Sequence, residues 1–212
     1  MHHIQQKILA LAKIEDIGKM TLREIGIKIG QGPQPQKIKH HLEQLKKRGF
    51  LKEDKNKRSI RVTSPGDSVS DGFYSIPLLG AANCGEAVHY AEAIPEGYLK
   101  VSKSFLSKQS AEGIFALRAI GDSMNRASPP IEDGDYVLID SLKRSPQDGD
   151  YILSIIDGCA NIKKYIKDSA NNQIVLISES SSDMMPIFID EKDKDDYMVN
   201  GVVIKVVKKP RN

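Results

Sequence analysis

The apolar pattern of this chain changes its period near residue 50, and that change limits the folds open to it. Before residue 50, apolar residues recur three or four positions apart, as in Ile38, Leu42 and Leu45, which predicts amphipathic helices. After it, short stretches alternate between apolar and polar residues, and Asp157-Gly158 is a typical hairpin turn. The 212 residues therefore predict an α+β multidomain chain, with a helical first part and a mostly β, partly barrel-like second part.

Three helices and a hairpin are predicted in residues 1–65. Thr21 and Glu24 form a capping box that begins the second helix, and Pro35 suits the first turn of the third. Two short strands follow around a polar turn, at residues 50–53 and 59–62. This order is typical of a winged helix-turn-helix DNA-binding domain.

The charge of the chain supports a nucleic-acid partner for the first part. Residues 1–65 hold 15 Lys and Arg against 6 Asp and Glu, a net charge of +9, whereas residues 66–212 hold 16 against 22, a net charge of −6. A solvated basic face would give the same count, so the placement of the charges matters more. We expect DNA contacts from the start of the third helix and from the turn between the strands, through Gln34, Gln36, Lys37, Lys39, His40, Lys55, Lys57 and Arg58.

Cysteine usage and hydropathy indicate the compartment. Cys84 and Cys159 are the only cysteines, too few for a disulfide framework, which favours a reducing environment. No signal segment opens the chain, and no run of about 18 apolar residues could span a bilayer. We expect a cytoplasmic protein without a membrane partner. The adjacent His40 and His41 diverge on a helix, so no metal site is predicted.

A linker is predicted at residues 66–75, where Ser, Gly and Asp predominate, and the second domain is predicted to begin at residue 76. The small residues 80–85 follow, ending in Cys84-Gly85, where little bulk would hinder an approaching nucleophile. On this stretch alone, Cys84 as a buried small side chain and Gly85 as a turn residue are the better explanation of the pattern.

A serine and two lysines in the second domain are candidates for catalysis. Ser123 follows the predicted strand 115–120, at a strand end where nucleophiles are common. A serine hydroxyl needs a base, and a lysine can serve as one only when burial keeps it neutral. Lys163 and Lys164 lie on opposite faces of the predicted strand 160–166, and alternation alone does not choose between them. An exposed strand charge is the plainer reading of either lysine.

Taken in order along the chain, several segments resemble the LexA/UmuD self-cleaving family, and together with the first domain the chain is similar to a LexA-type repressor. The segments are Gly80–Glu86, Gly121–Met124 with Ile131–Ile139, Asp148–Ser154, and Ile162–Tyr165. The resemblance implies a winged helix-turn-helix domain at residues 1–65, a linker at 66–75, and a signal-peptidase-like Ser-Lys self-cleavage and dimerisation domain at 76–212.

The resemblance also assigns roles to residues. It implies that Ser123 is the nucleophile, that Lys163 is the base, and that the cut falls between Cys84 and Gly85. The backbone amides of Ser123 and Met124 are then expected to stabilise the oxyanion. No cofactor is implied. The implied partners are operator DNA, a second copy bound through the C-terminal domain, and a RecA–single-stranded-DNA filament that stimulates cleavage in an SOS response to DNA damage.

Other functions remain open at this point. The β domain could instead only dimerise or sense a ligand, in which case the transcription factor would never be cut. A protease acting on other proteins is a second alternative, although it would not need the basic first domain. Within the LexA-type class, the sequence does not separate a host repressor from a prophage repressor.

Overall fold

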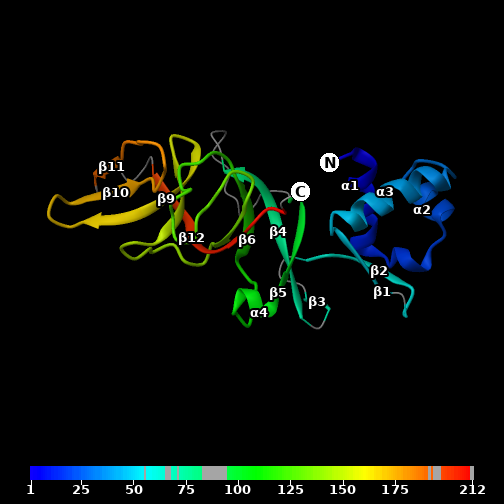
Figure 1. The fold of residues 1–212 in the computed structure, drawn as a ribbon. Helices are drawn as coiled ribbons and strands as arrows, with labels where there is room; N and C mark the ends of the chain where they lie inside the picture. The colour runs from blue at the N-terminus through cyan, green and yellow to red at the C-terminus, as the bar shows by residue number, and fades with distance from the viewer. Residues whose placement is uncertain are drawn as a thin grey trace. The chain divides into compact units, whose positions relative to one another are not determined.

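The computed structural model describes residues 1–54, 56–64, 68–70, 72–82, 95–190, 192 and 197–210, and the chain divides into two compact units (Figure 1). Unit 1 comprises Met1–Pro77 and Glu96–Ala111. Unit 2 comprises Leu78–Pro95 and Glu112–Asn212. The chain therefore passes between the units three times, at residues 77–78, 95–96 and 111–112.

The first part of unit 1 contains helices and a two-stranded antiparallel sheet: α1 (His3–Ile14), η1 (Ile17–Lys19), α2 (Leu22–Lys28), α3 (Pro35–Lys47), β1 (Leu51–Asp54) and β2 (Ser59–Val62). The three predicted α-helices and the hairpin are confirmed. Thr21 accepts from the Glu24 N–H while the Glu24 carboxylate accepts from the Thr21 N–H, so the predicted capping box begins α2. No helix among the described residues has the length and apolar character needed to cross a membrane.

One apolar core holds these elements together. Ile4, Ile8, Ile38 and Leu45 have no exposed surface, and they pack with residues from α2, β1 and β2. Because their spacing follows the helical period, one face of α1 and one face of α3 are buried while the opposite faces are exposed.

A single carboxylate ties the turn after α1 to strand β2. Asp16 accepts from the N–H of Gly18 at 3.1 Å and from the N–H of Ile60 at 2.9 Å. Gly18 lies so close to β2 that an added Cβ would stand 2.5 Å from the Ile60 nitrogen. Only glycine fits this approach, so strand β2 lies directly against the turn after α1.

The second part of unit 1 contains β3 (Ser68–Ser70), the start of β4 (Phe73–Ala82), β5 (Gly97–Ser102) and α4 (Lys103–Leu106), and both β3 and β5 pair with β4. The predicted linker, residues 66–75, thus contains β3 and the first residues of β4. Segment 96–111 contacts the rest of the unit: the Tyr98 N–H donates to the Arg48 carbonyl at 2.9 Å, the Tyr98 ring meets Phe50 edge-on, and the Tyr74 hydroxyl donates to the Gln109 carbonyl at 2.6 Å.

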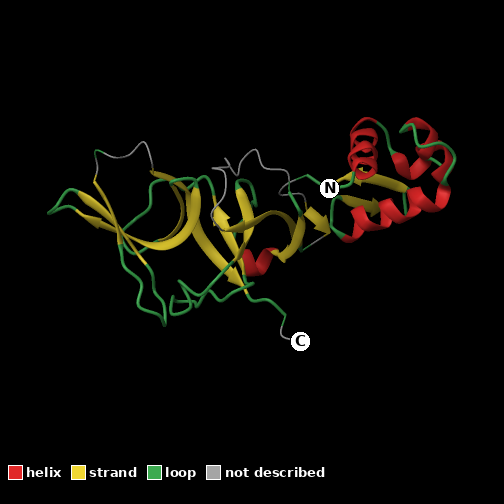
Figure 2. Cartoon of the chain, turned by 90° about the horizontal axis from the view of Figure 1, so that it is seen from above, coloured by secondary structure: helices red, strands yellow, loops and turns green. Residues whose placement is uncertain are grey.

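Unit 2 is built from strands, and no helix occurs in its described residues (Figure 2). Its strands are β6 (Ile114–Ala119), β7 (Tyr136–Asp140), β8 (Tyr151–Ile156), β9 (Cys159–Asp168), β10 (Gln173–Ile177), β11 (Ile187–Asp190) and β12 (Tyr197–Val207). They pair in the order β11-β10-β9-β8-β12-β7-β6, and β6 pairs in parallel with the end of β4. A mostly β second part is therefore confirmed.

The β8–β9 hairpin carries the predicted lysine pair. Asp157 and Gly158 both adopt positive φ, at 49° and 71°, as the two-residue hairpin turn predicted from the sequence requires. Ile162 packs in a core with residues of β6, β7 and β8, which fixes this end of β9 beside the end of β6. The fold thereby brings the segment after β6 close to the strand that carries Lys163.

Candidate active site

Ser123 lies on a turn whose two ends are anchored. On one side, the Ala119 N–H donates to the Asp135 carbonyl at 2.8 Å and the Gly121 N–H donates to Asp133 at 2.9 Å. On the other side, Met124 is 2 % exposed and its carbonyl accepts from the Ile131 N–H at 3.0 Å. Ser123 itself is half-buried and lies between these two anchored ends of the turn.

Lys163 and Lys164 have opposite environments. Burial lowers the pKa of the Lys163 amine, because a charged group loses its hydration there. The Lys164 amine instead donates to Glu179 at 2.7 Å, and this hydrogen bond raises its pKa. Of the two lysines, Lys163 is therefore the one whose surroundings favour the neutral form of the amine.

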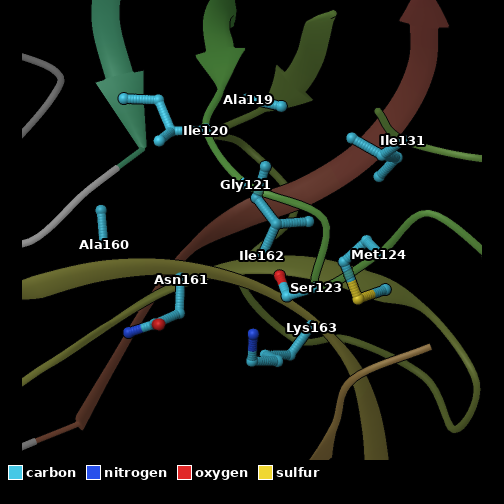
Figure 3. A pocket seen from close by; sticks show the side chains of 10 residues that line it. All are labelled: Ala119, Ile120, Gly121, Ser123, Met124, Ile131, Ala160, Asn161, Ile162 and Lys163. Atoms are coloured by element: carbon cyan, nitrogen blue, oxygen red, sulfur yellow. The ribbon is translucent and has the colours of Figure 1, made fainter. Parts of the chain in front are cut away.

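Ser123 and Lys163 line the same cavity, which has a volume of about 230 Å³ (Figure 3). The Lys163 amine and the Ser123 hydroxyl both face this cavity in the close view, although no hydrogen bond joins them in the described part of the chain. Among the described lining residues, Lys163 is the one ionisable side chain. The lining consists of Ala119, Ile120, Gly121, Ser123, Met124, Ile131, Ala160, Asn161, Ile162 and Lys163.

This arrangement has the parts needed for nucleophilic catalysis without a histidine. A serine hydroxyl can serve as a nucleophile, and a partly desolvated lysine amine can serve as its base. In a free enzyme, catalytic hydrogen bonds are often longer than in the reacting complex, so an open Ser123–Lys163 pair is compatible with that role. Cys84 and Gly85 lie outside the described residues.

The predicted DNA-contact residues lie on two exposed parts of unit 1. Gln34 precedes α3, and the exposed residues Gln36, Lys37, Lys39 and His40 alternate with buried Ile38, His41 and Leu42 along it. Lys57 and Arg58 are exposed in the turn between β1 and β2, and Lys55 lies outside the described residues. All the described members of the set are therefore available to a ligand.

Sequence reasoning missed the groups that hold the Ser123 loop from outside. The segment at residues 179–181 comes from beyond β10, and its Glu179 carboxylate also accepts from the Tyr151 hydroxyl at 2.5 Å. The buried Asp135 carboxylate, which accepts from Lys208 at 2.8 Å, was not singled out either. No periodic pattern marks such pairs, because their partners are far apart in the sequence.

Known proteins resemble this chain in sequence. A family model described as Peptidase S24-like matches residues 77–204. A LexA repressor from Carboxydothermus hydrogenoformans is 29 % identical over 198 residues, which cover 92 % of each chain. A LexA repressor from Geobacillus sp. strain WCH70 is 30 % identical over 193 residues, covering 87 % of this chain and 88 % of the relative. One from Clostridium kluyveri is 31 % identical over 172 residues, covering 81 % and 79 %. The similarity extends over both units.

Proposed function

The chain belongs to the Peptidase S24-like family of LexA-type proteins, and from that premise we propose that it is a DNA-binding transcriptional repressor of the DNA-damage (SOS) response that inactivates itself by cutting between Cys84 and Gly85. The observation that carries the proposal is the shared cavity of Ser123 and Lys163, in which burial lowers the pKa of the lysine.

In the proposed reaction, neutral Lys163 takes the proton of the Ser123 hydroxyl as the serine oxygen attacks the Cys84 carbonyl carbon. The backbone N–H groups of Ser123 and Met124 stabilise the negative oxygen that forms. The intermediate then releases the Gly85 amine, which takes the proton from Lys163, and leaves an ester on Ser123. Water hydrolyses this ester and restores the serine. Because both reactants belong to one chain, positioning supplies much of the rate.

The first unit would read the operator. Its three helices and β1–β2 sheet fit a winged helix-turn-helix, with the exposed start of α3 in the major groove and Lys57 and Arg58 on phosphates. A dimer formed through the C-terminal domain would join two such units and raise the apparent operator affinity. A RecA–single-stranded-DNA filament would promote cleavage by binding the cleavable conformer more tightly.

The proposal is tested by intact mass after incubation of the purified protein from neutral to alkaline pH. We expect fragments 1–84 and 85–212 from the wild type, at a rate that rises with pH as Lys163 loses its proton. Ser123→Ala and Lys163→Ala should both remain whole. Ser182→Ala and Lys143→Ala, which change exposed side chains of the same unit, should cut at the wild-type rate.

Two results would count against the proposal. Cleavage that persists in Ser123→Ala would remove the serine from the reaction. A wild type that stays whole at every pH, and also with RecA, ATP and single-stranded DNA, would leave a repressor whose second unit does not cut.

A further inference from the structure

Residues 179–181 form hydrogen bonds with the Ser123 loop on both sides of the serine. Before it, the Ser180 hydroxyl donates to the Asp122 carbonyl at 2.9 Å. After it, the Asn125 amide donates to the Ser181 hydroxyl at 2.7 Å and accepts from the Ser181 N–H at 2.8 Å. The Arg126 N–H donates to the Glu179 carbonyl at 2.8 Å. We call residues 179–181 the clasp.

The side chain of Glu179 fixes the clasp to the sheet. Its carboxylate accepts from Lys164 on β9 at 2.7 Å and from Tyr151 on β8 at 2.5 Å. These two hydrogen bonds lower the pKa of Glu179, so it is ionised at neutral pH. The Tyr151 hydroxyl in turn accepts from the Ser128 N–H at 2.9 Å, at the far end of the same loop. Since Lys164 adjoins Lys163, the clasp connects the nucleophile loop to the strand that carries the base.

The Ser180 hydroxyl bonds to the peptide unit that also carries the Ser123 N–H, a proposed donor to the oxyanion. The Asp122 carbonyl and the Ser123 N–H belong to one planar trans peptide, so they point in opposite directions. Holding the carbonyl toward Ser180 therefore aims the Ser123 N–H away from the clasp. The Asp122 carbonyl also accepts from the Asn125 N–H, but at 3.2 Å, so the Ser180 hydroxyl is the shorter of its two donors.

We propose that Ser180 is a positioning residue that orients the Asp122–Ser123 peptide for oxyanion binding. Glu179 anchors the clasp, and with it Ser180, to the strand that bears Lys163. The inference rests on the proposed self-cleavage at Ser123. Without the Ser180 hydroxyl, the peptide gains rotational freedom, and both the nucleophile and its oxyanion donor lose their alignment. Ser180 makes no hydrogen bond to Lys163, so the titration of the base should not change.

The test compares full-length wild type, Ser180→Ala, Ser180→Thr and Ser182→Ala across the alkaline pH series. We expect Ser180→Ala to lower the plateau rate of self-cleavage at least about tenfold, as a misaligned catalytic group does, with the apparent pKa of the rate unchanged. Ser180→Thr keeps the hydroxyl and should recover most of the rate. Ser182→Ala should match the wild type, because only the backbone N–H of Ser182 contacts Ser180.

Three results would overturn the inference: a plateau rate for Ser180→Ala within about threefold of the wild type, a shifted apparent pKa of the rate, or a rate loss explained by a matching fall in melting temperature.

A wild type that never cuts would instead refute the proposed function, and the clasp is then tested by labelling with a fluorophosphonate. In that reaction, the Ser123 oxygen bonds to phosphorus and fluoride leaves, and the proton passes to the base. We expect slower labelling of Ser180→Ala than of the wild type, and equal rates or no labelling of wild-type Ser123 would overturn the inference.

Discussion

Replacing Asp135 by alanine tests whether one buried carboxylate holds the turn before β7 to the chain after β12. The Asp135 side chain is 2 % exposed and accepts three hydrogen bonds, from the Lys208 amine at 2.8 Å, the Glu132 N–H at 2.9 Å and the Lys209 N–H at 3.0 Å. Its backbone carbonyl accepts from Ala119, at the end of the strand that leads to Ser123. The substitution removes the acceptor of the Glu132 and Lys209 N–H groups, whereas the Lys208 amine keeps two other acceptors.

The expected loss follows from these contacts. Hydrogen bonds to a charged acceptor contribute about 1.5 kcal/mol or more each, so the two backbone donors account for about 3 kcal/mol. The Lys208 side chain is 46 % exposed and keeps its hydrogen bonds to the Pro130 carbonyl and to Glu132, so its lost contact adds less than about 1 kcal/mol. Asp135→Ala should therefore lower the free energy of unfolding by about 3–4 kcal/mol, and Lys208→Met by less than about 1 kcal/mol.

The effect should also depend on pH. Burial alone would raise the pKa of Asp135, but hydrogen bonds from Lys208, Glu132 and Lys209 outweigh it and hold the pKa below its ordinary value. A carboxyl whose pKa is lowered by folding stabilises the protein above its unfolded-state pKa, near 4, and this contribution disappears as the pH falls through the folded-state pKa. The gap between wild type and Asp135→Ala should thus narrow in acid.

Urea unfolding monitored by circular dichroism, at a series of pH values from about 7 to about 2, measures both quantities. A loss below about 1 kcal/mol at neutral pH would refute the assigned role of the three hydrogen bonds. A gap that keeps its full size at the acid end would show that the ionised carboxylate is not the stabilising form.

Three further outcomes are expected. Thr21→Ala removes the capping box of α2 and should cost about 1 kcal/mol in urea unfolding, whereas a change below a few tenths would deny the cap a role. Lys163→Met should raise the melting temperature at neutral pH, because folding lowers the pKa of this amine and so disfavours its charged form. This gain in melting temperature should shrink as the pH rises toward the unfolded-state pKa of lysine, and a gain that does not change with pH would contradict the burial argument. Lys57→Ala should weaken DNA binding for all sequences and reduce the slope of log affinity against log salt by about 1. Gln36→Ala should weaken the binding free energy by about 1–3 kcal/mol on the preferred sequence alone, and fluorescence anisotropy at several salt concentrations distinguishes the two effects.

Local chemistry made the secondary structure predictable. The Thr21–Glu24 capping box and the Asp157-Gly158 turn are short-range devices, and both occur where the sequence indicated. Residues 66–75 illustrate the limit of this reasoning. Their Ser- and Gly-rich composition predicted a linker, but β3 and the start of β4 lie there because partner strands supply the hydrogen bonds.

The candidate site was predictable only in part, for a related reason. Alternation places Lys163 and Lys164 on opposite faces of β9 and does not choose between them. In the structure, Glu179 keeps Lys164 charged while Lys163 lines the cavity, and that carboxylate comes from a segment beyond β10. Contacts of this kind depend on tertiary folding, which residue spacing does not reveal.

The chain passes between the two units three times, so cutting one peptide bond and separating the two fragments would be different events. Under the proposed function, the fragment ending at Cys84 would lack residues 96–111, although Arg48, Phe50 and Tyr74 contact that segment within unit 1. The same fragment would carry β4, which pairs with β6. Breaking one peptide bond would remove none of these contacts, so the newly cut protein would be two fragments that are still held together. Induction of the repressed genes would then wait for β4 to leave the sheet, and the delay between cutting and induction would be set by the stability of a strand.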